Sequence, residues 1–450
     1  MGHDPKIFFN ENHDGGEKRM TKTIYQRVIV VLAFISFSSI GWASGNTANQ
    51  KEWTVLIYLN ADNNLEGAGY SDIHEMENVG SNDNINVVVQ FDWESTSGTN
   101  RYYIEKNTQP YSKDSHDIHS KLVEELGEQD MGSASTLEDF VEWGMKNYPA
   151  DHYFVIMWNH GSGWELNQQN INKGISYDDT SGNHIGTNDL ADAFLDIAQF
   201  NGKKVDVLGF DACLMGMYEI ADSLSDSVDY LVASEETIPW DGYPYDDLFN
   251  AFFNRDDRSP ANFAKDAVDT YGASYSGGSQ GNSSITNTAF DLSQMSALKE
   301  SLNNWIQDIM KTQKISSVDL LDASGNTQSY SYSTYRDLGD HVKRVMAKLS
   351  AATSSDGTSE QVQSKAISDG QDLLKAIHHV VIGNFNSDKY KASTGISIYL
   401  PYSSYGDSEW SASDGDNSLK QEYMSLNWAK TTDWPLYLDY LFPIPSIGWN

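Results

Sequence analysis

Residues 205–216 read VDVLGFDACLMG and contain Cys213, the only cysteine of the 450-residue chain. The segment opens with an apolar run, VDVLGF (205–210), that predicts a buried strand, and it continues into LMGMYEIADSL (214–224), which predicts a helix. Strands that are apolar throughout and lead into helices are typical of a parallel sheet covered on both faces. The sequence therefore places Cys213 just beyond a strand and at the start of a helix.

The same alternation extends outward from this segment. Apolar runs predict further strands at 53–59, 85–93, 152–158 and 228–234, and amphipathic stretches predict helices at 136–148 and 188–200. Ser135 and Glu138 have the S-x-x-E spacing of a capping box at the first of these helices. The predicted fold class is α/β, with a mostly parallel central sheet and helices on both faces.

The alternating core spans residues 51–255, and residues 256–450 read as C-terminal helical and strand additions. Helices are expected at about 260–275, 295–312, 335–350 and 362–382. Strand-like runs occur at 284–292 and 394–402, and the Ser/Gly/Thr-rich stretches 322–334 and 351–361 look like exposed loops. The pattern leaves open whether these additions form a separate domain or extra layers on the same sheet.

The first 43 residues have the layout of an N-terminal extension and a secretory signal peptide. From Met20 onward, basic residues precede an apolar run at 28–40, which ends in the small-residue sequence Gly41-Trp42-Ala43. We expect translation to start at Met20 and cleavage after Ala43, giving a secreted or periplasmic protein. No later run is long enough to anchor the chain in a membrane.

The chain is strongly acidic, with 64 acidic and 30 basic residues and a formal charge of −34. This sign argues against nucleic-acid binding. It is sufficient to explain solubility outside the cell, and it would attract a cationic substrate. A single cysteine excludes an internal disulfide, so an exported chain would keep the thiol either as a buried apolar group or for chemistry.

Two successive strand ends carry reactive groups. His160 follows the strand at 152–158, and Cys213 follows the next core strand along the chain. In an open parallel sheet the ligand site lies outside the carboxyl ends of the strands. A thiol and an imidazole there could act as nucleophile and general acid/base in acyl transfer, with the N–H groups of Gly161 and Cys213 as oxyanion donors.

With WNHGSGW (158–164) and DACLMG (211–216), the sequence resembles the clostripain family of cysteine peptidases. That family belongs with gingipains and legumains to the caspase-like superfamily. Further matching stretches follow in the same order: WTVLIYLNADNNLE (53–66), GISYDDTSG (174–182), ASEETIPWDGYPY (233–245) and TGISIYLP (394–401). The resemblance implies a caspase-like fold and a catalytic dyad of Cys213 and His160, with no cofactor required for the chemistry.

The resemblance also implies an endopeptidase that cleaves protein or peptide substrates after Arg or Lys. Asp241 matches the family's pocket aspartate, and Asp211 is a second candidate, because a carboxylate pairs well with a guanidinium or ammonium group. Family members are cut between the histidine and cysteine elements, and Lys173, followed by glycine in a polar stretch, is the expected self-cleavage site.

A structural or activating calcium ion is implied as well. The Asp/Asn-rich stretches NADNNLEG (60–67) and SYDDTSGN (176–183) offer oxygen ligands, but neither has EF-hand spacing and no ligand is assigned. The histidines lack zinc-site spacing.

Two alternatives remain open at this point. One is a non-enzymatic surface-binding protein in which Cys213 is a buried structural residue and the many aromatic side chains form binding platforms. The other is a transpeptidase that uses the same dyad. The preference between Arg and Lys and the oligomeric state are not fixed by the sequence.

Overall fold

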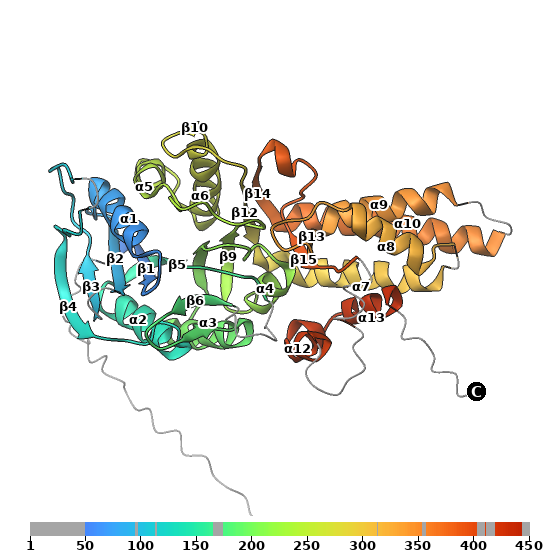
Figure 1. Ribbon diagram of the computed structural model, residues 1–450, viewed down its shortest axis with the longest axis horizontal. Coiled ribbons are helices and arrows are strands. Elements are labelled where there is room, and N and C mark those ends of the chain that lie inside the picture. The colour runs from blue at the N-terminus through green and yellow to red at the C-terminus, as the bar shows by residue number, and fades with distance from the viewer. Residues whose placement is uncertain are drawn as a thin grey trace, which may run out of the picture. The chain divides into compact units, whose positions relative to one another are not determined.

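A nine-stranded sheet forms the centre of the computed structural model, with the strand order β14-β12-β9-β8-β5-β1-β2-β3-β4 (Figure 1). The structure describes residues 50–94, 98–112, 115–164, 174–312, 314–352, 357–402, 410 and 419–442. These residues belong to one compact unit, Asn49–Asn450. The predicted signal peptide (1–43) lies outside the described residues.

The five central strands are parallel. They are β1 (Lys51–Ala61), β2 (Ile85–Trp93), β5 (Ala150–Trp158), β8 (Val205–Asp211) and β9 (Val228–Ala233). Each of the five was predicted from an apolar run, because a strand that is buried on both faces has no polar side to alternate with. The predicted mixed α/β class with a mostly parallel sheet is confirmed.

Antiparallel strands flank this centre on both sides: β3 (Gly98–Tyr103) and β4 (Lys121–Gly127) beyond β2, and β12 (Thr286–Asp291) and β14 (Val381–Asn386) beyond β9. The sequence analysis found β12 and missed the other three. The β4 sequence KLVEELG is exposed or half-buried along its whole length, so it carries the charges of an edge strand instead of an apolar run. The segment expected to be helical to residue 382 leaves its helix at Val380 and becomes β14.

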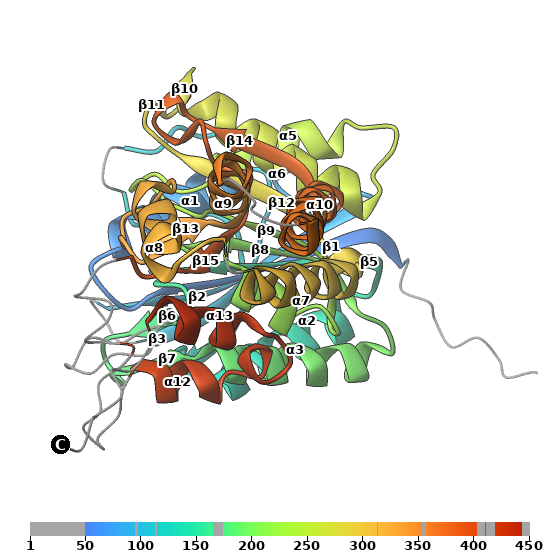
Figure 2. The same cartoon turned by 90° about the vertical axis from the view of Figure 1, so that its right-hand side faces the viewer.

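Both faces of the sheet carry a buried apolar layer, because successive side chains of a strand point to opposite faces. In β5, Val155 and Met157 belong to one core cluster, and Phe154 and Ile156 belong to the other. Helices α2 (Ala134–Asn147) and α3 (Thr187–Asn201) pack on the first cluster. Helices α1 (Glu66–Val79), α5 (Tyr245–Phe253) and α6 (Pro260–Ser274) pack on the second, on the opposite side of the sheet (Figures 1 and 2).

The C-terminal part adds both strands and helices. Beside β12 and β14 lie α7 (Met295–Lys311), α8 (Ser317–Asn326), α9 (Leu338–Ala351) and α10 (Gly357–Val380), which run next to one another in Figure 1. Two further helices are α12 (Leu419–Ser425) and α13 (Trp434–Leu441).

Short elements complete the described residues. Three small antiparallel pairs are β6 (Ile175–Asp178) with β7 (Asn183–Ile185), β10 (Ser276–Gly278) with β11 (Gly281–Asn282), and β13 (Tyr335–Asp337) with β15 (Ser397–Tyr399). The short helices are α4 (Tyr218–Ser223), η1 (Leu292–Gln294), η2 (Asp388–Tyr390) and η3 (Trp428–Lys430).

Several predicted boundaries are wrong, each for a local reason. The capping box predicted at Ser135 is absent, because α2 begins at Ala134, two residues before the predicted start at 136. Ser316 and Asp319 form a capping box at the start of α8, and the end of this helix, 322–326, lies in a stretch that was expected to be a loop. The helix predicted from 335 begins at Leu338, where the Asp337 side chain accepts a hydrogen bond from the N–H of Asp340. The loop predicted at 351–361 is shorter, since α10 begins at Gly357.

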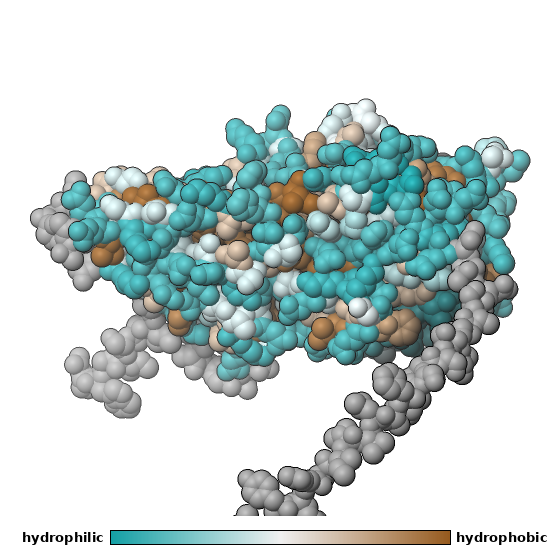
Figure 3. All heavy atoms as spheres, turned by 180° about the vertical axis from the view of Figure 1, so that it is seen from behind, coloured by the Kyte–Doolittle hydropathy of each residue, from teal (hydrophilic) through white to brown (hydrophobic). Residues whose placement is uncertain are grey.

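The surface agrees with the acidic composition. Hydrophilic residues cover most of the face seen in Figure 3, and the apolar residues there lie in small separate groups. In the part of the chain that the structure describes, no helix combines the length and apolar character needed to cross a membrane.

Candidate active site

The two predicted catalytic residues follow adjacent strands at matching heights. Strands β5 and β8 pair in parallel, with Trp158 opposite Asp211. His160 and Cys213 each lie two residues beyond this pair. They therefore leave the sheet at the same edge, on neighbouring strands.

A cavity of about 220 Å³ lies at this edge. It contains both predicted catalytic residues and the second of the predicted specificity aspartates. Its lining is Asn64, Leu65, Trp158, Asn159, His160, Asp211, Ala212, Cys213, Ile238, Pro239, Trp240 and Gly242. The spatial meeting of His160 and Cys213 that the strand pattern predicted is therefore present.

Cys213 does not start a helix, which corrects the sequence-based expectation. It lies in a turn, and α4 begins only at Tyr218. The reason is tertiary: the N–H of Gly216 donates to the carbonyl of Ser234, and its carbonyl accepts from the N–H of Ser397. These bonds keep the chain after Cys213 extended, so no helix dipole acts on the thiol.

The backbone just after the nucleophile is strained. Leu214 has φ 65°, a left-handed conformation that is unfavourable for a residue with a branched side chain. Its N–H donates to the carbonyl of Glu236 at 3.1 Å, and its side chain is buried. The surrounding contacts thus hold a tight turn that presents Cys213 to the cavity, and strained backbone of this kind is common at functional sites.

The surroundings of Cys213 favour the protonated thiol. Burial raises the pKa of Cys213, and the negative charges of Asp211 and Glu236 act in the same direction. The N–H of Ile238, which lies 3.2 Å from Sγ, opposes this shift without overcoming it. A neighbouring base is therefore needed to form the thiolate.

His160 is oriented by Asn64. Its Nε2 lies 2.8 Å from the side-chain Oδ1 of Asn64, an acceptor that favours a proton on Nε2. Nδ1, which makes no hydrogen bond with any described residue, is then left as the basic nitrogen. Burial lowers the pKa of His160, so the ring is neutral near pH 7 and able to take a proton.

Asn64 is a functional candidate that the sequence analysis did not identify. It lies in the stretch NADNNLEG, where the Asp/Asn content suggested only calcium ligands. Its position directly after the carboxyl end of β1, the strand next to β5, was the signal available in the sequence.

Gly161 lies against the backbone of the nucleophile. A Cβ at this position would lie 2.4 Å from the carbonyl oxygen of Cys213 and 3.1 Å from the Cβ of Ala212. Only glycine permits this approach. Within the described residues, neither the N–H of Gly161 nor that of Cys213 donates to another residue.

The two predicted specificity residues have different environments. Asp211 is buried at the cavity, and its Oδ2 accepts hydrogen bonds from the N–H of Tyr243 and the hydroxyl of Tyr245, both at 3.0 Å. Burial raises the pKa of Asp211 to about 6. Asp241 is exposed and does not line the cavity, although Trp240 and Gly242 on either side of it do.

The predicted self-cleavage residue, Lys173, lies outside the described residues. The residue after it, Gly174, is buried and held by Ser162: the Ser162 hydroxyl accepts from the Gly174 N–H at 2.9 Å, and the Ser162 N–H donates to the Gly174 carbonyl at 3.0 Å. The chain is therefore fixed immediately beyond the candidate cleavage site.

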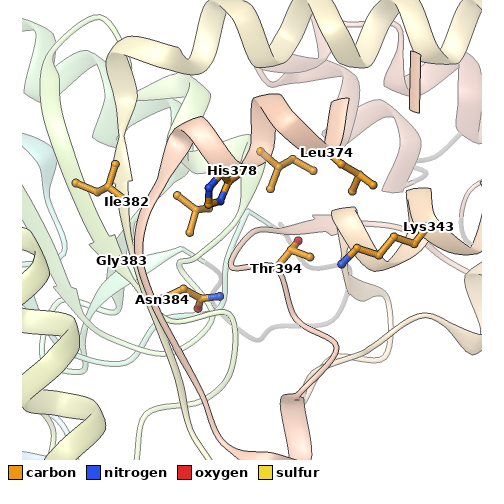
Figure 4. A pocket seen from close by; sticks show the side chains of 9 residues that line it. Lys343, Leu374, His378, Ile382, Gly383, Asn384 and Thr394 are labelled. Atoms are coloured by element: carbon orange, nitrogen blue, oxygen red, sulfur yellow. The ribbon is translucent and has the colours of Figure 1, made fainter. Parts of the chain in front are cut away.

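A larger cavity, of about 460 Å³, lies elsewhere, between α9, α10 and β14. Figure 4 shows Leu374 and His378 on one side of it, with Thr394 and Lys343 below them in the view. The cavity contains neither Cys213 nor His160, so its size does not make it the catalytic site.

One group of four carboxylates among the described residues has the spacing to hold a metal ion: Asp62, Asp92, Glu128 and Asp178. None of the four lines the cavity of Cys213 and His160.

Comparison with known proteins agrees with this geometry. A model of the clostripain family of peptidases matches residues 57–440. The chain belongs to the clostripain family. It is thus a cysteine peptidase, a hydrolase of peptide bonds, and the alternative of a non-enzymatic binding protein is wrong.

Individual members of the family show the extent of the similarity. This peptidase is 27% identical to clostripain of Hathewaya histolytica over 451 residues, covering 86% of this chain and 84% of the relative. A secreted C11 cysteine protease of Bacteroides thetaiotaomicron, solved with an irreversible peptide inhibitor, is 21% identical with a TM-score of 0.60, covering 85% of this chain and 99% of that one. An inactive C11 zymogen of Parabacteroides distasonis is 20% identical with a TM-score of 0.59, covering 85% and 98%. The caspase-like fold expected from the sequence is confirmed.

Proposed function

We propose that the protein is an endopeptidase that cleaves after Arg or Lys through a dyad of Cys213 and His160. The observation that carries the proposal is the shared cavity, in which a thiol, an imidazole and the buried carboxylate of Asp211 meet. Family membership indicates the reaction class. Within it we assign Cys213 as the nucleophile, His160 as the general acid/base and Asp211 as the receptor for the basic side chain.

The proposed reaction uses each of these groups in turn. Nδ1 of His160 takes the thiol proton, and Sγ of Cys213 attacks the carbonyl carbon of the scissile bond. The N–H groups of Gly161 and Cys213 stabilise the resulting oxyanion. The imidazolium then protonates the leaving amine, and the peptide bond breaks to give a thioester. Water, deprotonated by His160, hydrolyses the thioester and restores the thiol.

The preference for a basic side chain rests on the charge of the cavity. Asp211 has one carboxylate oxygen, Oδ1, without a hydrogen-bond partner among the described residues, while Oδ2 is held by two donors. Besides burial, the negative charges of Asp211 and Asp241 raise the pKa values of Asp72 and Glu75. A guanidinium or ammonium group would relieve the repulsion within this group. We assign the deep contact to Asp211 and a rim contact to Asp241.

The test compares fluorogenic peptides that differ only at P1 (Arg, Lys, Ala and Asp). We expect cleavage of the Arg and Lys substrates, and a Cys213→Ala enzyme at background rates, about 10⁴-fold lower or less. Asp211→Asn should lower kcat/KM for the basic substrates by about 10²-fold or more, because a desolvated charge pair is broken, and Asp241→Asn should have a smaller effect. Cleavage of the Arg substrate by Cys213→Ala would refute the dyad.

We further propose self-cleavage after Lys173. The Ser162 contacts to Gly174 would keep the new amino terminus in place, and β6, which follows it, would stay paired with β7. Mature protein should show two chains, the second beginning at Gly174 in amino-terminal sequencing. Lys173→Ala and Cys213→Ala should each remain a single chain. The same two fragments from Lys173→Ala would disprove this site.

Export through the N-terminal signal is also proposed. The first strand of the sheet begins at Lys51, so cleavage after Ala43 would leave the fold intact. Protein recovered outside the cytoplasm should begin at Ser44. A mature chain that still contains residues 20–43 would contradict this assignment.

A further inference from the structure

The chain that follows β9 forms hydrogen bonds to the turn that carries the nucleophile. The carbonyl of Glu236 accepts from the N–H of Leu214 at 3.1 Å, and the N–H of Ile238 donates to Sγ of Cys213 at 3.2 Å. One bond therefore restrains the thiol, and the other restrains the left-handed residue directly after it. We refer to residues 234–238 as the 234–238 loop.

The carboxylate of Glu236 is buried and accepts hydrogen bonds on both oxygens. Its residue is only 3% exposed. Oε1 accepts from the N–H and the hydroxyl of Thr237 at 2.8 and 3.1 Å, and from the N–H of Ser331 at 3.2 Å. The Ser331 hydroxyl also donates to Oε1, and the hydroxyl of Tyr390 donates to Oε2 at 2.6 Å. A buried carboxylate with donors on both oxygens is held in a single orientation.

The backbone of Glu236 is fixed as well. Its N–H is shared between Oγ of Ser234 and Oγ1 of Thr286, at 3.1 Å from each. Thr286 belongs to β12, Ser331 lies shortly before β13, and Tyr390 belongs to η2. Main chain and side chain of Glu236 are thus anchored to three segments of the C-terminal part. The C-terminal part therefore holds the 234–238 loop through this residue.

The charge of Glu236 does not help to form the thiolate. Burial acts to raise the pKa of Glu236, but the hydrogen bonds from Ser331 and Tyr390 act against it, and the pKa lies below its usual value. The side chain is therefore a carboxylate at neutral pH. Its negative charge contributes to raising the pKa of Cys213. Because this electrostatic effect opposes the reaction, a favourable contribution of Glu236 to catalysis has to come from geometry.

We propose that Glu236 is a positioning residue of the peptidase, which holds the 234–238 loop so that Sγ of Cys213 is aimed at the scissile carbonyl. The inference rests on the proposed role of Cys213 as the nucleophile. Ser331 and Tyr390 are not among the described residues that line the cavity, so they act through Glu236. The additions after residue 255 thereby take part in the reaction, although the proposed nucleophile and base both come from the core.

The kinetic test uses an Arg substrate and separates kcat from KM. Tyr390→Phe removes one donor to Glu236 and changes no residue of the cavity. We expect kcat to fall about 10-fold, because a small displacement of a reacting group is costly, while KM stays within about twofold of the wild type. KM depends mainly on the contact with the basic side chain, which this variant leaves intact.

The matched control is Tyr437→Phe. The Tyr437 hydroxyl is also buried and is hydrogen-bonded to Nε2 of His341 at the same distance, 2.6 Å, as that of Tyr390 to Glu236. Its removal should lower Tm by a similar amount, since the same kind of bond is lost. Its kcat should equal that of the wild type, because no described contact joins Tyr437 to the 234–238 loop.

Variants of Glu236 itself separate the reach of the side chain from its charge. Glu236→Gln keeps the length and retains an acceptor for Ser331, so kcat should fall by only about 10-fold. Glu236→Asp keeps the charge but is one methylene shorter and does not reach both Ser331 and Tyr390, so kcat should fall by about 10²-fold. A role of the charge alone would give the opposite order.

A second measurement needs no substrate. The pH midpoint for alkylation of Cys213 by iodoacetamide reports the pKa of the thiol. In Glu236→Gln this midpoint should move to lower pH, because a nearby negative charge is removed, even though kcat falls. Asp211 and His160, the other titratable groups of the cavity, are unchanged in this variant. Tyr437→Phe should leave the midpoint where it is in the wild type.

Four results would each overturn the proposal: wild-type kcat in both Tyr390→Phe and Glu236→Gln, an equal loss of kcat in Tyr437→Phe, a higher kcat in Glu236→Asp than in Glu236→Gln, or an unchanged alkylation midpoint in Glu236→Gln. If Glu236→Gln does not fold, Tyr390→Phe and its control decide. Failure of the proposed function has a different sign: the wild type then does not cleave the Arg substrate, and the alkylation midpoint alone decides on Glu236.

Discussion

Gly161→Ala provides a stringent test of the close contact between the two halves of the site. The new methyl group would lie 2.4 Å from the carbonyl oxygen of Cys213, whereas real contacts of a Cβ are not shorter than 3.0 Å. The backbone that carries the nucleophile must then move by at least about 0.6 Å relative to the backbone next to His160. Because a displacement of about 1 Å can cost about 10²-fold in rate, we expect kcat/KM to fall between about 10-fold and 10²-fold.

The assay is hydrolysis of a fluorogenic substrate with Arg at P1. The loss should appear mainly in kcat, because nucleophile, base and oxyanion donors must align only in the transition state. The control is Gly67→Ala, in helix α1, where a Cβ would meet nothing within 4 Å. That variant should keep full activity and gain slightly in stability, by about 0.5–1 kcal/mol, since alanine is the better helix former.

Full activity in Gly161→Ala, with its melting temperature unchanged, would refute the reasoning, because it would show that the two strand ends are not in tight contact in the working enzyme. A loss of activity that only parallels a loss of folded protein would refute it as well.

Three further predictions concern the ionisable groups. Asp211 is charged above its pKa of about 6 and neutral below it, so kcat/KM for an Arg substrate should fall as the pH drops through 6, mainly through a rise in KM. A substrate with citrulline at P1, similar in shape but uncharged, should lack this dependence, and an identical profile for the two would contradict the role of Asp211. Asn64→Ala should lower kcat/KM by about 10-fold, and Asn64→Asp should raise the pKa of His160, because a carboxylate stabilises the imidazolium; a pH profile that moves in neither variant would exclude the contact. Since burial raises the pKa of Cys213, iodoacetamide should alkylate it more slowly at pH 7 than it alkylates free cysteine, and faster alkylation would show a thiolate already formed.

The sequence predicted those parts of the fold that depend on continuous apolar runs. All five central strands could be read in this way, and with them the shared edge at which His160 and Cys213 lie. The edge strands could not be predicted, because β4 carries Glu and Lys side chains on a half-exposed surface and β14 continues a helix without a break. Their strand character comes from the partner strands, which pattern alone does not reveal.

The site was predictable to a similar degree. Motif positions indicated the nucleophile and the base, but the environment of Cys213 was misjudged. The segment after it has the composition of a helix, and only its bonds to Ser234 and Ser397 keep it extended. The contact of Asn64 with His160 joins residues that lie far apart in the chain, for which a single sequence carries little signal.

The order in which the strands are synthesised differs from their order in the sheet. Strand β9 pairs with β12, and β12 pairs with β14, where Thr286 lies opposite Asn386. A nascent chain therefore has the whole parallel centre before β12 can cover the edge of β9, and the edge of β12 then stays open until β14 has been made. During that interval the unpaired edge is a template for pairing with other chains, so we expect the polypeptide to depend on chaperones until residue 386 has been made.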